Sequence, residues 1–329
     1  MQPLTLPGTD LSVSPLCLGG VPFGLTLTAP ATFALLDRFV ELGGNFIDTA
    51  RVYSDWEPGE QHRSERVLGD WLHARGHRKR LVIATKGAHP FIASLTVPRT
   101  SAAEIRDDLE GSLRTLRIET VDLYWLHRDG TSRPVEHFID LLNTFLREGK
   151  IRAFGASNWT AARIRSANAY ALASGQQGFT ANQPFWCLGC QQSRPPPFTG
   201  YVKFDADGVD LHRETGLAVI PYTSQANGFF SKFALPPAQR PATFEAHEFH
   251  TLPNLAAGKI VLALAAAKRV PPSAIVLAYL WSRPAFPVVP IIGCRTTAQL
   301  EDSVAALRVR LSAGELQTLD HASESGLCA

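Results

Sequence analysis

One stretch of the chain decides the fold: VDLYWLH at residues 121–127, PVEHFIDLLNTFLREG at residues 134–149 and IRAFGASN at residues 151–158. The first and third pieces are short, nearly continuous apolar runs, which are typical of strands buried on both faces. The middle piece has helical spacing, with Val135, Phe138 and Leu142 on one side, and Pro134 and Gly149 mark its ends. Two buried strands joined by a helix predict a parallel β–α–β unit.

The same alternation extends in both directions from this unit. We predict further strands at residues 16–18, 46–47, 81–85, 179–182, 217–221 and 288–292. Helical spacing recurs at residues 67–72 and 300–307, and capping boxes start at Ser101 and Ser312. Pro290 weakens the last strand because proline removes a ladder donor.

These elements predict one α/β domain over residues 1–329. We expect a (β/α)8 TIM barrel over about residues 16–307, preceded by an N-terminal β-hairpin at residues 4–13. A C-terminal helix is expected at about residues 312–323. A chain with 45% hydrophobic residues can bury a core of this size.

Composition narrows the function classes. A net charge of +2 without a dense basic stripe gives no reason to expect a nucleic-acid partner. Residues 12–36 carry no charge, but six prolines and glycines would break a spanning helix there, so no membrane partner is expected. No secretory signal is evident, and five cysteines do not suggest a disulfide scaffold, so we expect a cytoplasmic protein. Cys187 and Cys190 have the spacing of a redox or zinc pair, but a zinc site would need a second pair of ligands, so no metal site is expected.

A polar residue follows each of seven predicted strands, at its C-terminal end. In parallel barrels the active site lies at this end of the strands. They are, in strand order from the second to the eighth, Asp48, Lys86, His127, Asn158, Gln183, Tyr222, and Gly293 with Arg295. Because the strands were identified from apolar runs alone, this clustering indicates a functional site.

The residue types at this rim suit carbonyl reduction, which needs a hydride at carbon and a proton at oxygen. Tyrosine is a weak acid with a pKa of about 10, and a nearby lysine ammonium should lower that pKa. Asp48 would keep Lys86 charged and oriented, provided that the loop after strand two folds Tyr53 back over the rim. His127 would orient the substrate oxygen or join the proton relay.

Several stretches resemble the aldo-keto reductase superfamily. They are NFIDTARVY at residues 45–53, IATKG at residues 83–87, DLYWLHR at residues 122–128, GKIRAFGASN at residues 149–158 and IIGCRTTAQL at residues 291–300. The resemblance implies that Asp48, Tyr53, Lys86 and His127 form a catalytic tetrad. It also implies an NADP(H) cofactor and a small-molecule carbonyl or alcohol as substrate.

The resemblance further implies where the cofactor binds. Ser157, Asn158 and Gln183 would hold the nicotinamide carboxamide, and Tyr222 would stack on its ring. The loop at residues 223–232, with Thr223, Ser224, Gln225, Gly228 and Lys232, would embrace the pyrophosphate. Arg295 and Gln299 would meet the 2′-phosphate and adenine, Asp302 and Ser303 would lie at the adenine, and Gly293 would also contact the cofactor. Contacts from Gly20, Val21 and Asp48 would complete the site. A guanidinium at position 295 suits a phosphate.

The sequence departs from the family at some positions. Asp302 and Ser303 stand where many members have Glu and Asn, and the loop after the third strand, residues 87–100, is longer than the minimal version. Two other functions are open at this point. Lys86 could form a Schiff base in a lyase, or the barrel could bind NADP(H) without catalysis, as a sensor or partner subunit.

Overall fold

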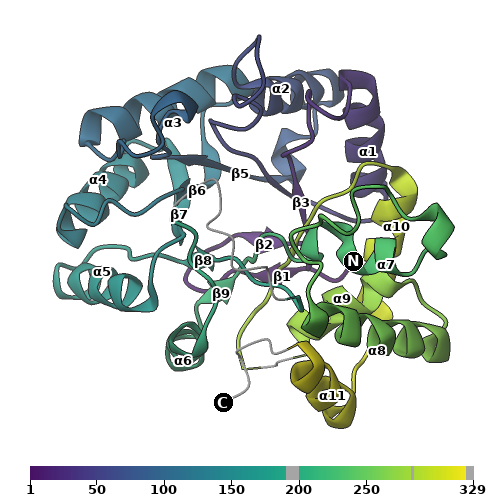
Figure 1. The fold of residues 1–329 in the computed structure, drawn as a ribbon. Coiled ribbons are helices and arrows are strands. Elements are labelled where there is room, and N and C mark those ends of the chain that lie inside the picture. The colour runs from purple at the N-terminus through teal and green to yellow at the C-terminus, as the bar shows by residue number, and fades with distance from the viewer. Residues whose placement is uncertain (190–199, 283–284, 324–329) are drawn as a thin grey trace.

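The computed structural model describes residues 1–189, 200–282 and 285–323. Its centre is a parallel eight-stranded sheet with the order β10-β3-β4-β5-β6-β7-β8-β9. The strands are β3 (Cys17–Gly19), β4 (Phe46–Asp48), β5 (Val82–Gly87), β6 (Val121–Leu126), β7 (Ile151–Ser157), β8 (Ala181–Gln183), β9 (Ala218–Val219) and β10 (Ile291–Ile292). Apart from β10 beside β3, neighbours in space are neighbours in sequence, so the predicted (β/α)8 fold is confirmed (Figure 1).

The barrel closes between β9 and the segment before β10. Val219 and Val288 form a parallel bridge, and the amides of Val289 and Ile291 donate to Val219 and Pro221 over 2.8 and 2.9 Å. Pro290 faces the other neighbour, where its carbonyl accepts from the Cys17 amide at 3.0 Å. The eighth strand therefore tolerates proline at a position whose missing N–H would face β3, and regular pairing is limited to Ile291 and Ile292.

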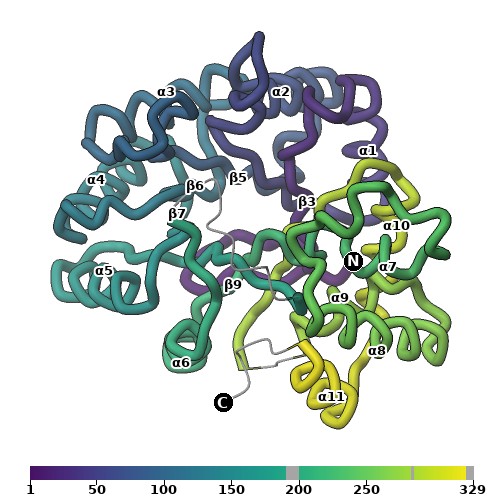
Figure 2. Tube along the Cα trace, viewed as in Figure 1, coloured from purple at the N-terminus to yellow at the C-terminus, as the bar shows by residue number. Residues whose placement is uncertain are grey.

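Helices surround the barrel (Figure 1). They are α1 (Ala29–Glu41), α2 (Arg63–Arg75), α3 (Ala102–Leu116), α4 (Val135–Arg147), α5 (Ala161–Ala173), α6 (Ala206–Thr215), α7 (Phe229–Phe233), α8 (Leu252–Lys268), α9 (Pro272–Trp281), α10 (Thr297–Ala305) and α11 (Ala313–Ser323). Ser101 and Glu104 form the capping box of α3, as predicted. The ring closes where α10 lies beside α1 (Figure 2), and the ion pair of Arg38 with Glu301 joins the two helices.

The N-terminal hairpin closes the end of the barrel opposite the predicted site. β1 (Leu4–Thr5) pairs antiparallel with β2 (Ser12–Val13). Leu6, Leu11 and Val13 pack in one buried cluster with strand residues that include Phe46 and Trp125. Asn45, just before β4, binds the hairpin strand through Ser12 at 2.8 Å, so the hairpin covers the strand beginnings.

Among the described residues, no individual helix has both the length and the apolar character needed to cross a bilayer. Helices α8 and α9 meet those criteria only as a pair, and their axes meet at 99°.

Candidate active site

The ends of consecutive strands place polar side chains around one rim of the barrel. Asp48 and Gln183 are the last residues of β4 and β8, and Lys86 is the second-last residue of β5. They lie inside the strand ends instead of following them as expected, because the ladder hydrogen bonds continue one or two residues further. His127 and Asn158 directly follow β6 and β7.

The segment after β4 turns Tyr53 back over this rim. The amides of Thr49 and Arg51 donate to the carbonyls of Ala84 and Lys86 at 2.9 and 3.0 Å, so the chain continues alongside β5. A turn follows, in which the Tyr53 amide donates to Ala50 at 3.1 Å. The loop folding on which the sequence-based hypothesis depended is therefore present in the structure.

Lys86 is the hub of the site. Its ammonium donates to an Asp48 carboxylate oxygen, to the Thr49 carbonyl at 2.8 Å and to the Tyr53 hydroxyl at 3.0 Å. Gln183 donates to the other Asp48 oxygen at 3.1 Å. Both Lys86 and Asp48 are only 1% exposed. The cation therefore has a full set of acceptors, one of which is the phenol oxygen.

Burial and the neighbouring charges shift the pKa values of Lys86 and Asp48 in opposite directions. Burial lowers the pKa of Lys86, but the nearby Asp48 and Tyr53 outweigh burial and raise the pKa overall. Burial raises the pKa of Asp48, and Lys86 opposes that rise. Lys86 is thus held as an ammonium ion against its buried carboxylate.

The prediction of a lowered pKa for Tyr53 is wrong for the phenol as a whole. Burial raises the pKa of Tyr53, and the lowering effect of Lys86 offsets only part of this. The effect of Lys86 has the predicted sign, but the composition of a loop does not reveal how deeply its tyrosine is buried. A phenol with a raised pKa retains its proton at neutral pH.

His127 faces Tyr53 and is neutral. The two rings lie 5.9 Å apart, edge to face. Burial lowers the pKa of His127 far below its usual value, and the charges of His89, Arg128 and Lys86 lower it further. The buried Nδ1 atom has no hydrogen-bond partner among the described residues. A buried polar atom without a partner costs free energy, so this nitrogen is suited to a ligand atom.

Asn158 links neighbouring parts of the rim. Its amide nitrogen donates to the His127 carbonyl at 3.2 Å and to Ser157 at 3.1 Å, and its oxygen accepts from the Tyr222 hydroxyl at 2.6 Å. Ser157 donates in turn to the Gln183 carbonyl at 3.0 Å. The residues expected around a nicotinamide are therefore joined in one network.

The loop after β9 has an unusual backbone. Thr223, Ala226 and Asn227 have φ values of 58°, 49° and 51°, and Gly228 follows at 75°. Backbone of this kind can form concave surfaces of N–H groups that bind anions. Ser224 donates to the Ile291 carbonyl, which ties the loop to β10.

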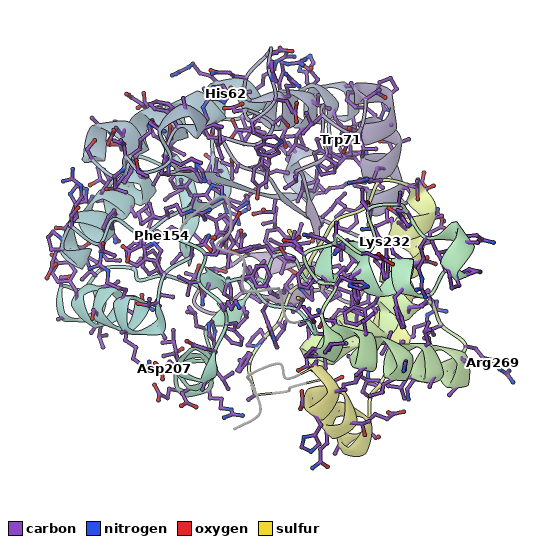
Figure 3. All side chains as sticks on the ribbon, in the orientation of Figure 1. His62, Trp71, Phe154, Asp207, Lys232 and Arg269 are labelled. Atoms are coloured by element: carbon purple, nitrogen blue, oxygen red, sulfur yellow. The ribbon has the colours of Figure 1, made fainter. Side chains whose placement is uncertain are left out.

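Two cations lie near this loop. Lys232, on α7 across the barrel from Phe154 (Figure 3), donates to the Asn227 carbonyl at 2.7 Å. Burial lowers the pKa of Lys232, and the positive charge of Arg295 lowers it further. Arg295 is exposed, and its amide donates to the Gln299 side chain at 2.8 Å. Two neighbouring cations favour an anionic ligand.

The remaining residues of the expected adenine site differ in exposure. Gln225 accepts from the Gly293 amide at 3.2 Å and donates to the Ser303 hydroxyl at 3.1 Å. Ser303 is fully buried, so it supports Gln225, whereas Asp302 is exposed.

Gly20, directly after β3, lies against the rim. Its amide donates to the Asp48 carbonyl at 2.7 Å, and a β-carbon at this position would lie 2.9 Å from the Ser64 hydroxyl oxygen. Val21, the next residue, is 44% exposed.

Three residues that were not predicted from the sequence, His89, Arg128 and Tyr201, also lie around the site. The His89 ring lies 4.7 Å from that of His127, and burial with the charge of Arg128 lowers the pKa of His89 to about 4. His89 lies in the long loop after β5, whose length was the only signal. The Arg128 guanidinium lies 5.0 Å from the centre of the Tyr201 ring. Cys187 is buried, Cys190 lies outside the described residues, and the described residues contain no cluster suited to a metal ion.

Comparison with known proteins yields one family. The model of the aldo/keto reductase family matches residues 15–324. Norsolorinic acid reductase stcV of Emericella nidulans is 32% identical and aligns with 95% of this chain and 79% of its own length. Two proteins are each 28% identical: aryl-alcohol dehydrogenase GME11368 of Pestalotiopsis microspora, over 96% of this chain and 80% of its own, and the aryl-alcohol dehydrogenase [NADP(+)] of Phanerodontia chrysosporium, over 95% and 83%.

Proposed function

Because the chain belongs to the aldo/keto reductase family, we propose that it is an NADP(H)-dependent reductase of aldehydes or ketones in which Tyr53 is the general acid. One observation carries this proposal: the Tyr53 hydroxyl lies 3.0 Å from the Lys86 ammonium, with neutral His127 beside it. A proton donor, a cation and a neutral hydrogen-bonding group thus meet at one place on the rim.

The residues of the chain divide the work of the reaction. When bound, the reduced cofactor supplies a hydride to the carbonyl carbon. Tyr53 transfers its hydroxyl proton to the carbonyl oxygen, and Lys86 stabilises the phenolate that forms. Asp48 keeps Lys86 charged in a buried place where an unpaired ammonium would be costly. His127 is neutral, so its imidazole can donate a hydrogen bond to the same oxygen and orient it.

Several residues fit the cofactor. The exposed guanidinium of Arg295, with Lys232 nearby, suits the 2′-phosphate that distinguishes NADP(H) from NAD(H). The loop at residues 223–228 supplies backbone suited to the pyrophosphate, and Ser157, Asn158 and Gln183 would hold the carboxamide beside Tyr222. One relative carries NADP(+) in its name, which supports the same cofactor.

Aromatic side chains around the rim suggest the substrate class. Trp56, Phe91 and Tyr201 lie on loops that follow strand ends, and they are 37%, 61% and 36% exposed. Large aromatic side chains left in solvent often mark a binding surface. Since two relatives are called aryl-alcohol dehydrogenases, we propose an aromatic aldehyde or ketone as substrate.

The two alternative functions, a Schiff-base lyase and a non-catalytic NADP(H)-binding barrel, have different requirements. A Schiff base needs a neutral lysine as nucleophile, but Lys86 has a raised pKa and its ammonium already has three acceptors. A non-catalytic barrel would bind NADPH without turnover.

The test is NADPH oxidation, followed by absorbance, with a panel of aromatic aldehydes and ketones, and with identification of the alcohol product. The proposal predicts stoichiometric alcohol formation. Tight NADPH binding without turnover on any carbonyl would support the non-catalytic alternative, and a borohydride-trapped adduct on Lys86 would support the lyase.

A further inference from the structure

Arg128 lies beside the reacting groups. It directly follows His127 and donates to the His127 carbonyl at 3.1 Å. Its guanidinium lies 5.0 Å from the centre of the Tyr201 ring, and the Tyr201 ring lies 6.1 Å from that of Tyr222. The side chain therefore extends from the end of β6 toward the loop that contains Tyr201.

The charge of Arg128 affects the pKa values of several neighbouring groups. Burial is the main cause of the lowered pKa values of His89 and His127, and Arg128 adds to both. Burial raises the pKa of Tyr222, and Arg128 opposes that rise. The positive charge of Arg128 thus lies close enough to His89, His127 and Tyr222 to affect their pKa values.

Arg128 has no carboxylate partner within the described part of the chain. The adjacent Asp129 binds Arg163 instead, at 2.9 and 3.0 Å. Arg99, a partly buried arginine of the neighbouring loop, has Asp108 at 2.9 Å. Arg128 is therefore a partly buried cation whose charge the described chain does not balance.

A guanidinium in this position suits an anionic ligand. It presents five N–H donors in a planar fork that matches a carboxylate. The cofactor phosphates have other cations, since Lys232 and Arg295 lie together near the loop after β9. We therefore expect the anion that binds Arg128 to be part of the substrate.

We propose that Arg128 binds a carboxylate group of the substrate, so that this chain acts on carbonyl compounds that also carry a carboxylate. This inference rests on the proposed reductase function. Arg128 is then a specificity-determining residue: it holds the far end of the substrate while His127 and Tyr53 meet its carbonyl oxygen.

The test compares substrates that differ in one charge. The probes are 2-, 3- and 4-carboxybenzaldehyde and their methyl esters, used with the wild-type protein, Arg128→Gln and Arg128→Lys. Arg165→Gln is the matched control, because Arg165 lies on the outer face of α5 and binds Glu214. Wild type and control should prefer at least one acid over its ester by about 10-fold or more in kcat/KM, the size expected of a charge-assisted hydrogen bond.

In Arg128→Gln this preference should disappear because the KM rises more for the acid than for its ester, while the KM for NADPH stays within about 3-fold of wild type. Arg128→Lys should retain part of the preference, because it keeps the charge but loses the fork. The inference is overturned if wild type shows no acid preference, or if Arg128→Gln keeps it. It is also overturned if Arg128→Gln raises only the KM for NADPH, since Arg128 would then serve the cofactor.

Binding of the same probes, measured by calorimetry, separates this inference from the reductase function. If no probe is reduced, the proposed reaction fails, yet weaker binding of the acid to Arg128→Gln than to Arg165→Gln would still support the carboxylate site. Equal binding to both variants would overturn it.

Discussion

The Lys86 ammonium lies 3.0 Å from the Tyr53 hydroxyl, although the two residues are 33 positions apart in the chain. The barrel produces this contact, because β4 and β5 are parallel neighbours and the segment after β4 turns back over the end of β5. In the pairing of β4 with β5, Asp48 lies opposite Ala84, which is two residues before Lys86. Two separate segments of sequence, residues 48–53 and the end of β5, thus form one proton-donating unit.

Asp48→Asn should strongly destabilise the protein. The substitution leaves the buried Lys86 ammonium without its counter-charge, which costs about 3 to 5 kcal/mol of unfolding free energy for pairs of this kind. Urea denaturation of both proteins measures the difference. The control is Glu214→Gln, which breaks the exposed pair with Arg165 and should cost less than about 1 kcal/mol. Equal losses in the two variants would show that the Asp48–Lys86 pair does not behave as a buried one.

Arg295→Ala should weaken NADPH binding selectively. Loss of a charge-assisted contact with the 2′-phosphate predicts a KM for NADPH that is about 10- to 100-fold higher, and a KM for NADH that hardly changes. Initial rates with both cofactors measure this selectivity. Arg269→Ala, at the exposed end of α8, serves as control. A similar rise for both cofactors would contradict the assignment of Arg295 to the 2′-phosphate.

His212 should make the protein less stable in acid. Burial lowers its pKa from 6.5 to about 4, while its ring bonds the Leu217 carbonyl at 2.6 Å. Between pH 6.5 and pH 4 the unfolded chain binds a proton at His212 that the folded chain does not, so the unfolding free energy falls as the pH falls. The contribution is about 1.4 kcal/mol per pH unit.

His212→Gln removes this proton uptake, so its unfolding free energy should change less steeply over the same pH window. Denaturation curves at pH 5, 6 and 7 compare the two proteins. Identical slopes would mean that His212 is protonated equally in the folded and unfolded states.

The fold followed from the sequence because burial on both faces gives barrel strands an apolar signature. That signature identified β6 and β7 closely, and helix caps such as Ser101 marked the starts of helices. The apolar signature failed where strand pairing is irregular. It predicted one strand over residues 217–221, but β9 is only Ala218–Val219. Proline at position 221 has no N–H to donate to a neighbouring strand. Local pattern cannot reveal how two such short strands close a barrel.

The shared rim position of the strand-end residues was predictable from the sequence, but the electrostatics of the site were not. The position of each strand end indicated that Asp48, Lys86 and His127 share a rim. The direction of the Tyr53 pKa was not predictable, because it depends on the balance between burial and one cation. The convergence of His89, Arg128 and Tyr201 depends on loop conformations, such as the positive φ of Ala88, that have no sequence signature.

The most direct test of the central claim is the rate of carbonyl reduction by Tyr53→Phe, with NADPH binding measured on the same preparation by fluorescence. Removing the hydroxyl removes the proton donor but keeps the ring, so kcat should fall about 100- to 10,000-fold while the NADPH Kd stays within about 3-fold. Tyr170→Phe, which loses an exposed hydroxyl that binds Asp140, should behave like wild type. A Tyr53→Phe protein with wild-type kcat would contradict the role of Tyr53 as the general acid.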